Sequence, residues 1–217
     1  YTFVFGNLAQ LSTDGIPRTL FYFGGTMLWH YFQTCLLNVS DTFIANANLF
    51  GKVYFPRFTV PISKIFSNLI ELSIQIIVLI LLYLYFLKTS MINSPSWQVL
   101  LIPLIIIWLA LLSMGFGMVI SALTTKYRDL RHLVTFGMGL WMYATPVVYP
   151  ISEISGKLRW IMDINPVSAP IELFRYFAFG AGNPNIRSSM ISLSICIVLL
   201  YIGLLLFHRS ENTFIDV

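Results

Sequence analysis

Polar side chains recur at helical spacing in two stretches of this otherwise apolar chain. In one stretch the steps are four, three and four residues, at Lys64, Asn68, Glu71 and Gln75. At 100° per residue these steps place the side chains in one line along a helix. In the preceding stretch His30, Thr34 and Asp41 share one face in the same way. Such polar lines can bond neighbouring helices or line a hydrated passage, and both interpretations stay open.

Aromatic residues make up 16% of the chain and gather in groups around residues 21–32 and 141–149. Belts at the two membrane–water interfaces explain most such residues. The alternative is a lining on which sugar rings stack, because aromatic faces offer broad contact without demanding one register. The polar lines and these groups together supply the candidate residues of a translocation path: Trp29, His30, Thr34, Asp41, Asn68, Glu71, Gln75 and Tyr143.

Motifs for nucleotide binding or catalysis are missing from the sequence. The nearest approaches to a phosphate-binding loop, Gly51-Lys52 and Gly156-Lys157, lack the upstream Gly and the Ser or Thr after Lys. The three His residues lie far apart without metal-ligand spacing, and no Gly-x-Ser-x-Gly motif occurs. We therefore expect this chain to bind no ATP, cofactor or metal itself and to carry no catalytic site.

The composition indicates a membrane protein. Hydrophobic residues make up 57% of the 217 residues and charged residues 10%, whereas a soluble domain has about a quarter of its residues charged. The net charge of +4 does not indicate nucleic-acid binding, because the basic residues are dispersed along the chain. Cys35 and Cys196 both lie in apolar runs, which argues against a disulfide framework.

Five apolar segments are each long enough to cross a bilayer, which takes about 20 residues. They are residues 19–49, 59–87, 97–123, 133–149 and 188–207. Residues 1–11 are too short to cross, and we expect them to be the remnant of a sixth span. Within the third segment, Ser113, Gly117 and Ser121 form a small-residue face that lets another helix approach closely.

Basic residues in the short loops predict the orientation of these spans. Loops 46–64 and 124–132 are rich in Lys and Arg and should be cytoplasmic, whereas loop 88–96 holds only Lys88 and should lie outside. The connection 150–187 is too long and too apolar for an ordinary loop. We expect two short helices there that dip in from outside, at 151–164 and at 167–179 between Pro166 and Gly180.

Three stretches and the tail carry a family resemblance. They are NLFGKVYFPR (48–57) with Pro61-Ile62-Ser63, KYRDLR (126–131), WMYATPVVYP (141–150) with Asn165-Pro166, and ENTFID (211–216). Together they resemble the ABC-2 permeases that export polysaccharides and polyol phosphates, among them O-antigen, capsule and teichoic-acid exporters. The resemblance spans nearly the whole chain.

The resemblance implies an all-α, polytopic membrane protein in which residues 1–217 form a single transmembrane domain, with short re-entrant helices before the last span. It also implies that an N-terminal interface helix and most of the first span are missing from this sequence. The expected assembly is a permease homodimer with six spans per subunit and two copies of a separate ABC ATPase subunit, which would carry ATP and Mg²⁺. The expected location is the bacterial inner membrane.

Several residues near the cytoplasmic side could couple the spans to that ATPase. Pro56 and Pro61 interrupt the helix where the chain leaves the membrane, so the basic element around Arg57 is short and rigid. The alternative role of this element is a positive-inside anchor. The coupling candidates are Lys52, Phe55, Pro56, Arg57, Lys126, Arg128, Asp129 and Arg131.

Thr145 and Pro146 fall late in the span 133–149, where proline removes a backbone hydrogen bond. They form either a passive kink or a hinge that opens the outer half of the span, and the two roles stay open.

These features predict ATP-driven export of a lipid-linked polysaccharide of the O-antigen type or of a teichoic-acid-like polymer, with direction and cargo taken from the resemblance. Two alternatives stay open: an ABC-2 exporter of a smaller lipid or drug, and an integral-membrane glycosyltransferase or acyltransferase. An enzyme should carry an acidic or His constellation at one membrane face, and we find none in the sequence.

Overall fold

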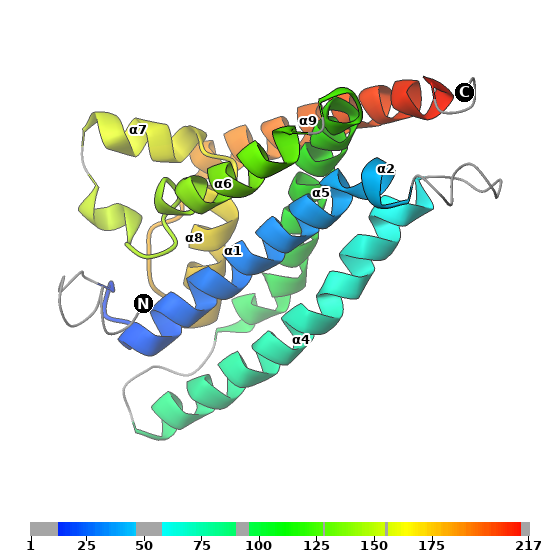
Figure 1. Cartoon of the computed structure of the whole chain (residues 1–217). Coiled ribbons are helices and arrows are strands. Elements are labelled where there is room, and N and C mark those ends of the chain that lie inside the picture. The colour runs from blue at the N-terminus through cyan, green and yellow to red at the C-terminus, as the bar shows by residue number, and fades with distance from the viewer. Residues whose placement is uncertain (1–12, 47–57, 90–95, 128, 155, 214–217) are drawn as a thin grey trace.

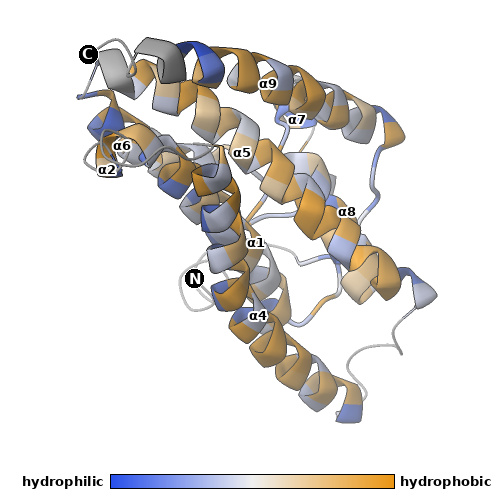
Figure 2. Ribbon diagram, turned by 90° about the vertical axis from the view of Figure 1, so that its right-hand side faces the viewer, coloured by the Kyte–Doolittle hydropathy of each residue, from blue (hydrophilic) through white to orange (hydrophobic). Residues whose placement is uncertain are grey.

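The computed structural model describes residues 13–46, 58–89, 96–127, 129–154 and 156–213. Over these residues the chain is helical without any strand, which confirms the predicted all-α fold (Figure 1). Three helices in the described part are long and apolar enough to span a membrane: Thr59–Lys88, Trp97–Thr124 and Ile186–Arg209. Figure 2 shows that apolar residues dominate these helices. The predicted remnant at 1–11 lies outside the described residues.

Helix α1, Arg18–Ser40, lies at the centre of the helical bundle. It is 23 residues long, or about 34 Å, which is sufficient to cross a bilayer. It packs against α4, α5, α6 and α8, and more than half of its residues are buried. Its polar residues are therefore tolerated because other helices, and not lipid, surround most of it.

Helix α1 ends at Ser40, and after Asp41 a single turn of helix follows, α2 (Thr42–Ala45). Helix α4, Thr59–Lys88, then runs back alongside α1 (Figure 1). Its buried residues Ile65, Leu72 and Leu79 recur at steps of seven, which makes one narrow seam against the core. Ten large apolar side chains of α4 are exposed, as expected for a helix that meets lipid.

Helices α5 (Ile102–Lys126, preceded by the 3₁₀ turn η2, Trp97–Leu101) and α9 (Ile186–Thr213) pack closely together. A Cβ atom at Gly203 of α9 would lie only 2.9 Å from the carbonyl oxygen of Gly115. On the opposite side of α5, a Cβ atom at Gly117 would lie 2.6 Å from Val39 Cβ of α1. The predicted small-residue face on α5 is therefore confirmed as a face for close helix packing.

Helix α6, Leu130–Tyr143, is 14 residues long and ends six residues before the predicted limit of this span. The prediction of one span over 133–149 is therefore wrong at its C-terminal end, where residues 144–149 form turns and bends. The physical reason is Pro146, which lacks a backbone N–H and disfavours helical geometry in the residue before it. Pro146 consequently lies beyond the helix and does not kink it.

Two short helices follow in the connection before the last span, as predicted, although the first begins at Lys157 and not at residue 151. After the 3₁₀ turn η3 (Ile151–Glu153) they are α7, Lys157–Ile164, and α8, Ser168–Phe179. Gly180 ends α8 at φ +71°, in the left-handed region that favours glycine. Helix α8 packs against α1, α5 and α9, so it belongs to the core of the bundle.

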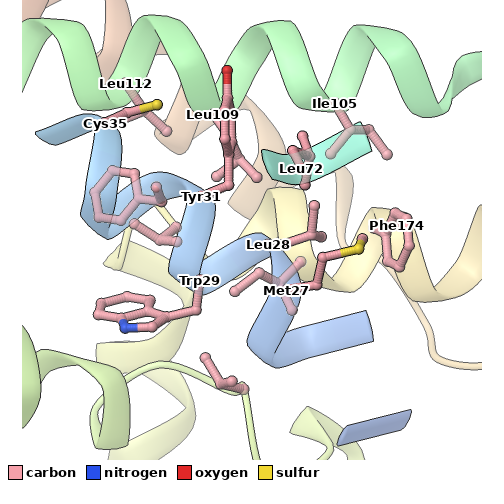
Figure 3. Packing of buried hydrophobic residues seen from close by; sticks show 14 of the residues in the cluster. Met27, Leu28, Trp29, Tyr31, Cys35, Leu72, Ile105, Leu109, Leu112 and Phe174 are labelled. Carbon is pink, nitrogen blue, oxygen red and sulfur yellow. The ribbon is translucent and has the colours of Figure 1, made fainter. Parts of the chain in front are cut away.

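An aromatic cluster ties the second half of α6 to this core. The Trp141 ring of α6 lies with its centroid 6.0 Å from Trp29 and 5.5 Å from Phe32, both on α1. Phe116 of α5 completes the cluster at 5.2 Å from Trp141. Figure 3 shows Trp29 among the buried apolar residues around α1.

Candidate functional site

A narrow pocket lined by polar side chains, without room for a water molecule in this structure, lies between α1 and α4 near the middle of both helices. It is lined by His30, Tyr31 and Thr34 from α1 and by Asn68, Glu71, Leu72 and Gln75 from α4. His30 Nδ1 lies 3.6 Å from Glu71 Oε1, and each of these two side chains is 53% exposed. The two polar lines seen in the sequence therefore face each other, and most of their members line one pocket.

Hydrogen bonds join the same two helices closer to the Asp41 end of α1. Asn38 Nδ2 donates to Asn68 Oδ1 at 3.0 Å, and Asn68 Nδ2 donates to Cys35 Sγ at 3.3 Å. Helix-to-helix bonding is thus the role of Asn68 in this structure. His30 and Glu71 differ from Asn68, because about half of each of these two side chains is exposed on the surface of the subunit.

The depth of His30 and Glu71 along their helices restricts what can cover them. Each is twelve residues from the first residue of its helix, or about 18 Å along the axis. Ionisable side chains this far inside a membrane face other protein or a water-filled cavity. The open side of the pocket is therefore a surface for protein or water and not for lipid.

Trp29 is absent from this pocket, although it was a candidate for the translocation path. Its side chain is 2% exposed, and its indole Nε1 donates to Gln33 Oε1 at 3.1 Å. The rings of Trp141 and Phe32 cover its indole inside the core, and its role in a path stays a prediction that this burial does not favour. Tyr143, at the end of α6, has a ring that is 55% exposed, and its role in a path stays a prediction.

Asp41 also lies away from the pocket, at the end of α1 that the loop charges place on the cytoplasmic side. Its Oδ2 atom lies 2.8 Å from Arg131 Nη2, near the start of α6. The structure thus brings Asp41, a candidate for the translocation path, into contact with Arg131, a candidate for coupling to the ATPase. Asp129 immediately precedes α6 but makes no side-chain capping bond to it.

Most of the other coupling candidates cannot be placed. Lys52, Phe55, Pro56, Arg57 and Arg128 lie outside the residues that the structure describes, and so does the side chain of Lys126. Their coupling role stays a prediction.

Thr145 and Pro146 are buried directly after α6. Asn165 Nδ2 donates to Thr145 Oγ1 at 2.9 Å and to the Ala144 carbonyl oxygen at 3.0 Å. The Asn165 Oδ1 atom accepts a bond from Trp141 Nε1 at 3.3 Å. One buried asparagine therefore holds the last turn of α6 and the start of the hinge candidate together.

Arg175 of α8 holds the same segment from the other side. It is 4% exposed, and its guanidinium donates to the carbonyl oxygens of Pro146 at 2.7 Å and Val147 at 2.6 Å. The guanidinium also lies 3.7 Å from the centroid of the Phe21 ring, in cation–π geometry, and Glu172 is near enough to offset its charge. Carbonyl oxygens and an aromatic face thus hold the two terminal nitrogens of this buried cation, whereas its Nε atom is buried without a hydrogen-bond partner.

Sequence reasoning missed Arg175 and treated Asn165 only as part of a resembling motif. The signal for Arg175 was present, since it is a basic residue inside a short apolar segment, where a cation needs partners. Which carbonyl groups it meets depends on the path of residues 144–149, which no local pattern predicts.

The described residues offer hydrogen bonding and charge to a passing ligand. Among them, no group of three or more His, Cys, Asp or Glu side chains could hold a metal ion. Hydrogen-bonding and charged side chains can steer and solvate a polar cargo that crosses an apolar layer.

Comparison with known proteins places this geometry in a family. The model of the family described as "ABC-2 type transporter" matches residues 1–179, which include α1 to α8. The chain belongs to the ABC-2 type transporter family. The family assignment confirms the resemblance drawn from the motifs at 48–57, 126–131 and 141–150.

Named relatives of this ABC-2 chain are permeases. Two proteins from Klebsiella pneumoniae, each named O-antigen export system permease protein RfbA, are 30% identical to it over 219 residues, covering 100% of this chain and 81% of the relative. A protein of the same name from Myxococcus xanthus is 22% identical over 218 residues, with the same coverage. As an ABC-2 family member the chain is a membrane transport component, and this family works in general with an ABC ATPase. A membrane glycosyltransferase or acyltransferase finds no support in these comparisons.

Proposed function

We propose that this chain is the permease subunit of an ATP-driven exporter that moves a lipid-linked polysaccharide of the O-antigen class across the bacterial inner membrane. The observation that carries the proposal is similarity along the whole chain to relatives whose names state O-antigen export. A shared cargo class is more plausible when similarity covers every helix than when it covers one motif.

The polar side chains around the pocket between α1 and α4 supply one wall of the passage. A glycan carries many hydroxyl groups, so its path through the membrane needs hydrogen-bonding side chains that face water. His30 and Glu71 are half exposed at mid-depth and meet this need, with Thr34 and Gln75 beside them. Tyr143 adds an exposed aromatic ring at the outer end of α6, where a sugar face could stack.

A second copy of the chain would close this passage. Helix α6 has only Met138 buried, and a Cβ atom added at Gly137 or Gly139 would meet nothing within 4 Å. Exposed small residues allow another helix to approach, which suits a permease homodimer. Two copies of an ABC ATPase would bind the cytoplasmic loops that contain Arg57 and Arg131.

A deletion experiment tests the cargo. Removing the gene should abolish polysaccharide on the cell surface and leave its lipid-linked form at the cytoplasmic leaflet, and the wild-type gene should reverse both effects. Surface polysaccharide that is unchanged, together with altered drug sensitivity or lipid distribution, would favour the exporter of a smaller lipid or drug. Co-purification of an ATPase subunit with the tagged chain tests the assembly.

A further inference from the structure

Helix α6 is held by its two ends more than along its length. Leu133, Phe136 and Leu140 are 66%, 69% and 58% exposed, and Met138 is the buried residue of this helix. Buried hydrogen bonds hold one end of α6, and an ion pair holds the other. The difference between those contacts determines which end can move.

The outer end of α6 is anchored by buried hydrogen bonds. Asn165 bonds Trp141, Ala144 and Thr145, and Arg175 bonds the carbonyl groups of the next two residues. Bonds with a charged donor are strong, and breaking a buried one leaves an unsatisfied group. Helix α8, which carries Arg175, is itself packed into the core.

A glycine on α1 shows how tightly this outer anchor is built. A Cβ atom at Gly25 would lie 2.6 Å from the Val147 carbonyl oxygen and 2.8 Å from Arg175 Nη2. Only glycine leaves room for this contact. The outer anchor therefore joins α1, α8 and the chain after α6 at one point.

The cytoplasmic end of α6 is held against α1 by the ion pair of Arg131 with Asp41. The Arg131 side chain is 52% exposed and the Asp41 side chain 23%. Water reaches the Arg131 side of this pair, whereas Asp41 Oδ1 is buried without a hydrogen-bond partner. A partly exposed ion pair opens at smaller cost than the buried bonds at the outer end. This pair also lies at the end of the stretch 126–131, which contains four of the eight coupling candidates.

We propose that the Asp41–Arg131 pair is a release latch, and that α6 pivots about its buried outer anchor when the pair opens. A 14-residue helix is about 21 Å long, so a turn of about 15° would move its cytoplasmic end by about 5 Å. This movement opens the contact between α6 and α1 toward the cytoplasmic leaflet. It rests on the proposed function, since a lipid-linked cargo would enter from that leaflet.

In this mechanism Asp41 and Arg131 are positioning residues, and Thr145 and Pro146 are the fixed end of α6. The hinge interpretation of Thr145 and Pro146 is replaced by a pivot that their bonds to Asn165 and Arg175 hold in place. The moving end is the one nearest the ATPase, which is where force from ATP binding would be applied.

Spin-label distances in the full-length protein in lipid nanodiscs test the latch. One label pair, at Ser63 and His132, reports the cytoplasmic ends of α4 and α6, and a second pair, at Tyr143 and Ile186, reports the outer ends of α6 and α9. All four positions are exposed. Both native cysteines, which are buried, are replaced by alanine in every sample.

Opening the Asp41–Arg131 pair should change the distance between the labels at Ser63 and His132. The distance between the labels at Tyr143 and Ile186 should stay the same. Asp41→Asn and Arg131→Gln should each raise the population with the longer cytoplasmic distance about two- to fivefold, as expected for loss of one partly exposed pair. The charge exchange Asp41→Arg with Arg131→Asp should restore the wild-type distribution. The matched control, Lys88→Gln, removes an exposed charge at the other end of α4 and should change neither distance.

The proposal is overturned if both single variants keep the wild-type cytoplasmic distance, or if the outer distance changes as much as the cytoplasmic one. These distances require neither ATPase nor cargo. If the label distances respond as expected but the protein exports no polysaccharide, the latch stands and the proposed function alone is contradicted. Charge exchange that restores the distance but only partly restores export would still support the latch.

Discussion

The imidazole of His30 and the carboxylate of Glu71 lie 3.6 Å apart, on helices that run side by side, with half of each side chain open to the surroundings. The pair sits near the middle of both helices, where an exposed charge has no place against lipid. This relationship distinguishes the pocket between α1 and α4 from ordinary helix packing.

Neutralising this pair should reduce export without disrupting the bundle. Glu71→Gln and His30→Gln keep the size of each side chain, so we expect normal expression and dimerisation but about tenfold less surface polysaccharide, equivalent to about 1.4 kcal/mol on the barrier. Surface polysaccharide is measured on cells that express each variant at equal levels. Ser67→Ala, an exposed change one turn earlier on α4, is the control. Wild-type export by both variants would remove the pocket from the passage.

Loss of Arg175 should destabilise the subunit. Arg175→Met leaves the carbonyl oxygens of Pro146 and Val147 buried without a donor, which should cost about 3 kcal/mol. Arg175→Lys should recover part of this loss because it keeps one charged donor. Thermal stability in detergent, followed by size-exclusion chromatography, measures the effect. The exposed Arg187 provides the comparison, since Arg187→Met should leave the melting temperature unchanged.

Substitution by alanine should destabilise the subunit at one glycine and have no effect on its stability at another. Gly25→Ala places a methyl group within 2.6 Å of the Val147 carbonyl oxygen and should cost about 1–3 kcal/mol of stability. Gly137→Ala on α6 meets nothing within 4 Å and should be neutral within one subunit. The same melting assay compares them. A loss of dimer, with unchanged subunit stability, in Gly137→Ala would indicate that a second copy packs against α6.

Arg57→Glu should uncouple the transporter from its ATPase. The change reverses a charge in the loop that we expect on the cytoplasmic side, without altering a span, so insertion should survive while export falls and the ATPase dissociates or hydrolyses ATP unproductively. Pull-down of the ATPase and surface polysaccharide are the two measurements. Lys88→Glu, on the opposite side, should be nearly silent. If Arg57→Glu exports normally and binds the ATPase as wild type does, Arg57 is a topology anchor.

Cysteine labelling tests the orientation on which these predictions depend. An impermeant thiol reagent added to intact cells should label cysteine at positions 88 and 157 but not at 52 or 126, because the loop charges place the last two inside. Permeabilised cells should label all four positions. Labelling of position 52 from outside would reverse the topology.

Local patterns in the sequence were sufficient for the fold class and for part of the site. Apolar runs interrupted by charged loops predict a polytopic helical protein, because hydropathy and loop charge are properties of each segment alone. The helical steps from Asn68 to Glu71 and Gln75 likewise predict a polar face before any packing is known. Pro166 and Gly180 bracket α8 for the same local reason.

Only the tertiary structure decided what each of those faces meets. Trp29 and His30 are neighbours in sequence, yet α6 covers the first while the second stays half exposed beside Glu71. The pairing of Asp41 with Arg131, and of Arg175 with the carbonyl groups after α6, joins segments separated by many residues. Such contacts depend on how whole helices pack, since burial on one side of a helix is set by its neighbours and not by its own sequence.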